Sequence, residues 1–137
     1  MQGTEVTSIA DRTLLWLMTL YCAASLLHFA HNAEYLADYP NLPAWLTRSQ
    51  VYIAWLGVTA IGALGYLVRR ASYELAGLAL VGTYAALGFD GLLHYGRAPV
   101  TAHTTAMNLT IWFEVATAAL LLGAVLILAT KSARDGR

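Results

Sequence analysis

The residues of this 137-residue chain that could do chemistry are histidines and carboxylates set within or next to long apolar stretches. They are His28, His31, Asp90, His94, His103 and Glu114, and they include all four histidines of the protein. An ionisable side chain such as Asp at the centre of a membrane-spanning helix costs about 2.5–3.5 kcal/mol on insertion scales. Residues kept at that cost need a reason, and imidazoles that converge with carboxylates are ligands for a first-row transition metal. The pattern therefore predicts a metal site.

Two other interpretations of these residues stay open. His28 and His31 are three residues apart near a helix end, where both rings could reach the interface and water. Asp90 and His94 are four residues apart, so they could form a buried hydrogen bond that fixes helix packing. Read together, the same groups could also form a path for protons or ions.

Neither the metal nor the cofactor class is fixed by the sequence. Nitrogen and carboxylate ligands suit iron, copper, zinc or manganese, whereas the lone Cys22 excludes a cysteine-rich structural zinc site. A b-type haem is the alternative cofactor, because His94 and a histidine of the first apolar stretch could be its two axial ligands. Gly88 and Gly91 could then make room for the porphyrin.

The composition shows in what kind of protein these residues lie. Hydrophobic residues make up 58% of the chain and charged residues 12%, about half the charged share of a soluble domain. The formal net charge is zero, which argues against nucleic-acid binding, and a single cysteine cannot form a disulfide within the chain. We therefore expect an integral membrane protein.

Four stretches are long and apolar enough to cross a bilayer, which takes roughly 20 residues. They cover residues 13–35, 49–68, 73–95 and 102–130. Proline and glycine separate the first pair and the last pair, while the middle pair is joined by a very short turn. The predicted fold is all-α, a four-helix bundle that forms a single transmembrane domain over residues 1–137.

The basic residues predict the orientation of this bundle. Two of them, Arg48 and Arg97, lie on one side, and the other side carries Arg12, Arg69, Arg70, Lys131, Arg134 and Arg137. By the positive-inside rule, both termini are in the cytoplasm and the protein belongs to a plasma or inner membrane.

A helical rise of about 1.5 Å per residue places the candidate side chains at a common depth. His28 lies roughly 24 Å beyond Arg12, and Asp90 lies the same distance beyond Glu74. Glu114 lies about 25 Å before Lys131. Tyr52 lies at the same depth, seventeen residues before Arg69. Each of the four predicted helices therefore contributes one polar side chain to this layer.

The remaining candidates lie above this layer. His31 and His94 are about one turn higher, and the count puts His103 at roughly 42 Å, so it could join only if the last helix tilts or unwinds. We expect the neighbouring polar groups to support the ligands rather than bind metal. They are Asn32, Glu34, Tyr35 and Tyr52.

A small membrane-bound metalloenzyme or redox component is the function that these expectations favour. Its substrate would be a small molecule dissolved in membrane lipid or in the periplasm. The alternatives are a metal-handling protein and an accessory subunit without catalysis, the latter within a homo-oligomer or a larger membrane complex. The sequence identifies no catalytic residue, because it contains no nucleophile or nucleotide-binding motif.

Overall fold

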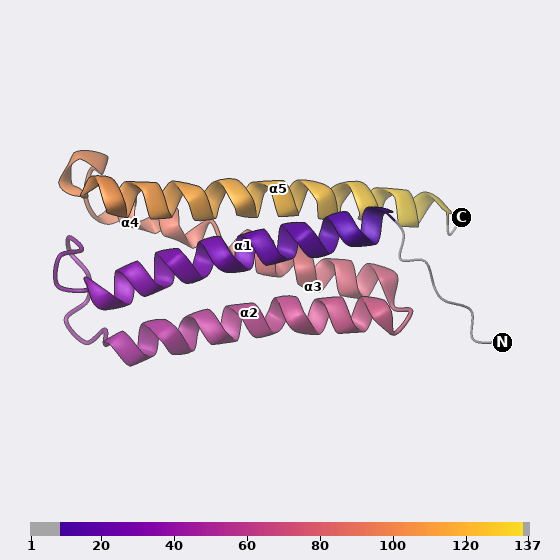
Figure 1. The fold of residues 1–137 in the computed structure, drawn as a ribbon, viewed down its shortest axis with the longest axis horizontal. Helices are drawn as coiled ribbons and strands as arrows, with labels where there is room; N and C mark the ends of the chain where they lie inside the picture. Colours follow the sequence, from indigo (N-terminus) through magenta and orange to yellow (C-terminus); the bar gives the residue numbers. More distant parts are fainter. Residues whose placement is uncertain (1–8, 136–137) are drawn as a thin grey trace.

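The computed structural model describes residues 9–135, and these are helical apart from short connections (Figure 1). The described part contains no strand, so the all-α prediction is confirmed. Its elements, in order, are α1 (Ile9–Glu34), α2 (Arg48–Arg70), α3 (Glu74–Leu87), the 3₁₀ turn η1 (Asp90–Leu92), α4 (Leu93–Arg97), the 3₁₀ turn η2 (Val100–Ala102) and α5 (Thr105–Asp135). Arg137, used above for the orientation, lies outside the described residues.

Four helical segments are long and apolar enough to cross a membrane, as the sequence predicts. They are α1, α2, the stretch Glu74–Arg97 and α5. The third segment is not one continuous helix, because α3 ends at Leu87 and the chain continues through η1 before α4 begins. Asp90 and His94 therefore belong to different elements, and the simple spacing of a regular helix does not apply between them.

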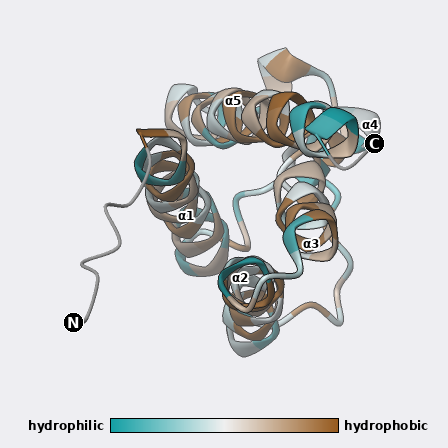
Figure 2. Cartoon of the chain, turned by 90° about the vertical axis from the view of Figure 1, so that its right-hand side faces the viewer, coloured by the Kyte–Doolittle hydropathy of each residue, from teal (hydrophilic) through white to brown (hydrophobic). Residues whose placement is uncertain are grey.

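The four segments run side by side along the long axis of the molecule (Figures 1 and 2). Helix α2 packs mainly on α3, and α1 mainly on α5. Small residues let the first pair approach closely, as is common between membrane helices. A Cβ at Gly62 would lie 2.5 Å from the ring of Tyr84, and a Cβ at Gly65 would lie 2.8 Å from the backbone nitrogen of Val81.

The two ends of the molecule have different structures. The first and last described residues lie at the same end as the α2–α3 turn (Figure 1). Arg69 joins the elements there, with nitrogen–oxygen distances of 2.6 Å to Asp11 and 2.9 Å to Glu74. We call the opposite end, which carries residues 35–47 and 98–104, the distal end. Asn41 connects these two loops by donating a hydrogen bond to the carbonyl oxygen of Arg97 at 2.8 Å.

Candidate metal centre

A histidine and a glutamate from the first and last helices meet inside the bundle toward the distal end. Nε2 of His28 lies 3.8 Å from Oε2 of Glu114, too far for a hydrogen bond. The two residues are 2% and 0% exposed. Nδ1 of His28 and both carboxylate oxygens of Glu114 lack a hydrogen-bond partner among the described residues. Buried polar atoms are normally satisfied, so this pair has unused capacity to bind a ligand.

Gly91 lies directly against this pair. A Cβ at Gly91 would lie 3.3 Å from Oε2 of Glu114 and 3.9 Å from Nε2 of His28. The missing side chain thus leaves the space next to both atoms free. Gly88 has another role, because a Cβ there would lie 2.6 Å from the side chains of Tyr21 and Ala118. Gly88 therefore serves close helix packing.

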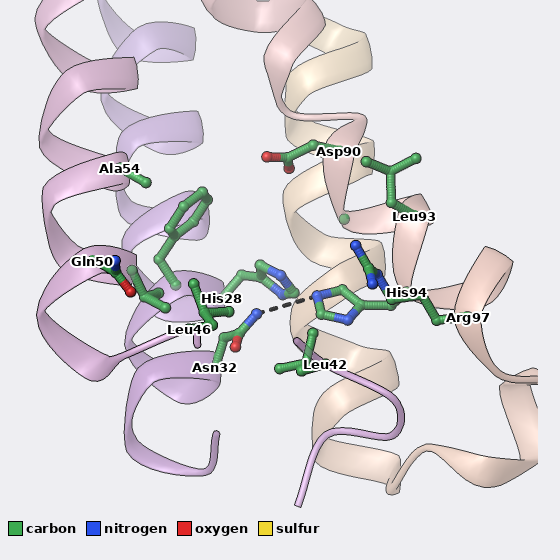
Figure 3. Close-up of a pocket in the computed structure, with 13 residues that line it drawn as sticks. His28, Asn32, Leu42, Leu46, Gln50, Ala54, Asp90, Leu93, His94 and Arg97 are labelled. Atoms are coloured by element: carbon green, nitrogen blue, oxygen red, sulfur yellow. Dashed lines mark hydrogen bonds between the residues drawn. The ribbon is translucent and has the colours of Figure 1, made fainter. Parts of the chain in front are cut away.

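His94 approaches the pair from α4. Its ring centroid lies 5.4 Å from that of His28, in an edge-on arrangement, and Figure 3 shows the two imidazoles directed toward each other. Nε2 of His94 lies 3.2 Å from the amide nitrogen of Asn32. Nδ1 of His94 is buried without a partner in the described part of the chain. The predicted supporting residue Asn32 thus touches a predicted ligand.

His103 reaches the same cluster although the helical count placed it far above. The chain turns back through η2, and the residue lies just before α5 rather than within it. Its ring centroid is 6.1 Å from that of His94. Nδ1 lies 3.0 Å from the carbonyl oxygen of Pro99, and because a carbonyl only accepts, Nδ1 carries the proton. Nε2, buried and without a partner among residues 9–135, then carries the lone pair.

Histidines that bind metals typically have this arrangement. One ring nitrogen donates to a carbonyl or carboxylate, which orients the ring and fixes the tautomer, and the other binds the ion. The hydrogen bond from His103 to Pro99 leaves Nε2 in the form that a ligand requires.

His31 connects to the cluster through Tyr39, a residue that the sequence analysis did not place at the site. Nδ1 of His31 is 2.9 Å from the hydroxyl of Tyr39, whose ring centroid lies 4.9 Å from that of His94. Burial raises the pKa of Tyr39 to about 12, so its hydroxyl stays protonated at neutral pH. Tyr39 lies in a loop, directly before Pro40, so no helical periodicity could have placed it beside His94.

Asp90 lies beside the cluster, in an adjoining pocket of about 210 Å³. The pocket lies between α1, α2 and the η1–α4 segment, and its polar lining residues are His28, Asn32, Gln50, Asp90, His94 and Arg97. Figure 3 shows the carboxylate of Asp90 directed into this space. Two of these residues, Gln50 and Arg97, were not predicted, because residues near a helix end resemble an ordinary solvated rim.

The other expected supporting residues lie at the distal rim. The hydroxyl of Tyr52 donates to Glu34 at 2.8 Å, and Glu34 pairs with Arg48 at 2.7 Å. Tyr35 is 52% exposed and packs on His31 with a centroid distance of 4.7 Å. Glu34 thus accepts from Tyr52 and pairs with Arg48. The hydroxyl of Tyr52 is directed to Glu34 at the distal end and not to the layer of His28 and Glu114.

The cluster is not a closed metal site as its side chains stand. Among the described residues, no three His, Cys, Asp or Glu side chains are placed so that they could hold one ion together. The structure instead gives one close pair, His28 and Glu114, with two further imidazoles nearby.

Comparison with known proteins adds no further constraint. No protein-family model, curated protein or solved structure matches the chain.

Proposed function

We propose that this chain is an integral membrane protein whose distal cluster binds one first-row transition metal ion. The ligands would be His28, Glu114 and His94, with His103 as the fourth. One observation carries the proposal: both carboxylate oxygens of Glu114 and Nε2 of His103 are buried without a hydrogen-bond partner in the described structure. Leaving such an atom unsatisfied costs about 1–3 kcal/mol, and an ion would satisfy several of them at once.

The separation of the closest pair supports a shared ion. Two ligand atoms that each lie about 2.1 Å from one metal ion are at most about 4.2 Å apart. The distance of 3.8 Å between His28 and Glu114 falls within that limit. To become the third ligand, His94 would turn its ring away from Asn32. His103 would bind through Nε2, which has no hydrogen-bond partner among the described residues.

The geometry supports a single ion better than a haem. A porphyrin would have to pass between the rings of His28 and its partner His94, which already stand 5.4 Å apart edge-on. Gly88, expected to leave space for it, is covered by Tyr21 and Ala118. Asp90 and His31 are weaker ligand candidates, since the first lines the adjoining pocket and the second is engaged by Tyr39.

The adjoining pocket favours a metalloenzyme or redox component. It ends at His28 and His94, so a small molecule bound there would stand next to the ligands. A bound ion would supply an open coordination position that polarises water or substrate. Asn32 and Gln50 would orient that molecule through their amide groups. The surrounding residues of the pocket would keep bulk water away from the site.

A metal-handling protein or an accessory subunit is the second candidate. It is favoured by the lack of three converging ligands in the described structure, because an incompletely assembled site would release its ion easily. We further infer an inner or plasma membrane location with both termini in the cytoplasm. The basic residues Arg12, Arg69 and Lys131 at the end opposite the cluster support this orientation.

Elemental analysis of the detergent-purified protein tests the proposal. We expect close to one equivalent of iron, copper, zinc or manganese in the wild type. His28→Ala and Glu114→Ala should remove it, whereas Glu34→Ala, which changes a carboxylate at the rim, should retain it. A metal-free wild type that also fails to take up added metal would overturn the proposal. A Soret band would instead identify haem.

A further inference from the structure

A second cavity lies between α1 and α2, away from the ionisable cluster. It has a volume of about 480 Å³, and its walls are almost entirely apolar or aromatic. Its lining residues fall on three helices and include Leu15, Cys22 and Leu26 of α1, Trp55 and Ala63 of α2, and Tyr84 of α3. We call this cavity the apolar groove and the 210 Å³ pocket described above the polar pocket.

The two cavities follow each other along the same pair of helices. On α1 the apolar groove ends at Leu26, and the polar pocket begins at His28. On α2 the groove ends at Trp55, and the pocket begins at Ala54. The seam between α1 and α2 therefore changes from apolar to polar within one or two residues of each helix.

The length of the groove matches a hydrocarbon chain. From Leu15 to Leu26 it follows twelve residues of α1, or about 16 Å at the helical rise. This is close to half of a hydrocarbon core about 30 Å thick, and so to the depth of one leaflet. Thr19, a polar residue of the wall, directs its hydroxyl to the carbonyl of Leu15 in its own helix at 2.9 Å.

The seam is accessible from outside the bundle, because the groove residues Leu15, Leu26 and Ala63 are exposed. Where the groove meets the pocket, the indole of Trp55 donates a hydrogen bond to Oγ of Ser25 at 3.2 Å. This bond joins the two helices at the junction. Ala23 and Ala63 also line the groove, and their small side chains leave the groove open.

The residues of the polar pocket indicate which head group a hydrocarbon chain bound in the groove would carry. It has one acidic and one basic side chain, Asp90 and Arg97, together with the amides of Asn32 and Gln50. Opposite charges in one small space disfavour a head group with a net charge of either sign. Hydroxyl or carbonyl oxygens suit these donors and acceptors.

We infer that the α1–α2 seam binds a membrane-dissolved amphiphile with a single hydrocarbon chain and a small, uncharged head group that carries oxygen. The chain lies in the apolar groove, and the head lies in the polar pocket against His28 and His94. This inference rests on the proposed function, because it names the class of molecule that the metal centre would receive. In this arrangement the molecule enters sideways from the lipid, between α1 and α2.

Photolabelling in phosphatidylcholine vesicles tests the inference. The probe is hexadecanol with a diazirine at the far end of its chain, and mass spectrometry locates the adducts. We expect adducts along the groove, at residues such as Leu15 and Ala63. Ala63→Trp should reduce labelling roughly tenfold, since excluding as few as two methylene groups removes that much affinity. Ala60→Trp, an exposed position on the same helix outside the groove, is the matched control and should label like the wild type.

The outcomes separate this inference from the metal proposal. If Ala63→Trp and Ala60→Trp are labelled equally, or if adducts are spread evenly over lipid-facing residues, the hydrocarbon chain does not bind in the apolar groove. Equal labelling by the matching diazirine of palmitic acid, whose head is charged, overturns the uncharged head group. Metal content, measured on the same samples, should be unchanged in Ala63→Trp. A wild type that labels in the groove but holds no metal would refute the metal centre and leave the binding of the amphiphile standing.

Discussion

Replacing Gly91 by alanine changes no charge and no ligand, yet we expect it to weaken metal binding. The added methyl group would lie 3.3 Å from Oε2 of Glu114 and 3.9 Å from Nε2 of His28. The first distance is shorter than an ordinary contact, so the carboxylate must move by a few tenths of an ångström. Binding sites need their ligands within about 0.5 Å of the productive geometry, so this shift uses up most of that margin.

The size of the effect follows from the behaviour of residues that orient metal ligands. Changes at such positions cost about 10–100-fold in metal affinity, which corresponds to roughly 1.4–2.7 kcal/mol. Competition with a chromogenic chelator, on protein stripped of metal in detergent, measures this affinity. Gly96→Ala is the control, because a Cβ at Gly96 would meet nothing within 4 Å, and it lies in the same interrupted third segment.

The comparison of the two glycine variants can refute the reasoning. If Gly91→Ala binds metal as tightly as Gly96→Ala while Glu114→Ala binds none, the ion does not lie between His28 and Glu114. If both glycine variants lose affinity equally, the effect comes from the backbone of this segment and not from the methyl group beside the carboxylate.

Gly88→Ala should lower the free energy of unfolding by about 1–3 kcal/mol, because its Cβ would meet Tyr21 and Ala118 at 2.6 Å; denaturant titration in detergent measures this. Tyr39→Phe should destabilise the protein at pH 8, and its deficit relative to wild type should shrink from pH 10 towards 12, because burial raises the pKa of Tyr39 to about 12 and the neutral phenol is the stabilising form. In a Cys22→Ser background, Ala44→Cys should react in intact cells with a membrane-impermeant maleimide, whereas Ser132→Cys should react only after lysis; the reverse pattern would contradict the proposed orientation.

The sequence was sufficient to predict the helices and part of the depth relationship. Composition and punctuation located the four membrane-length segments to within a few residues. Counting the helical rise per residue put His28 and Glu114 in one layer. In the structure, Nε2 of His28 lies 3.8 Å from Oε2 of Glu114. Such a count works for these residues because α1 and α5 are uninterrupted over the relevant length.

The same count fails wherever the chain departs from a regular helix. It put His103 far beyond the layer because it assumed that the last helix continues through residue 103, whereas the chain folds back through η2. It gave the height of Tyr52 but not its direction, and the side chain bonds to Glu34. Depth along a helix is readable from sequence, but the rotation of each helix and the path of each loop depend on packing.

The cluster draws on both ends of the chain, and this has a consequence for how the protein matures. His28 lies on α1 and Glu114 on α5, and 85 residues separate them in the sequence. A nascent chain with three segments inserted therefore lacks one half of the closest pair. Loading of an ion would therefore wait until α5 has packed against α1, and an occupied centre would link these two helices directly.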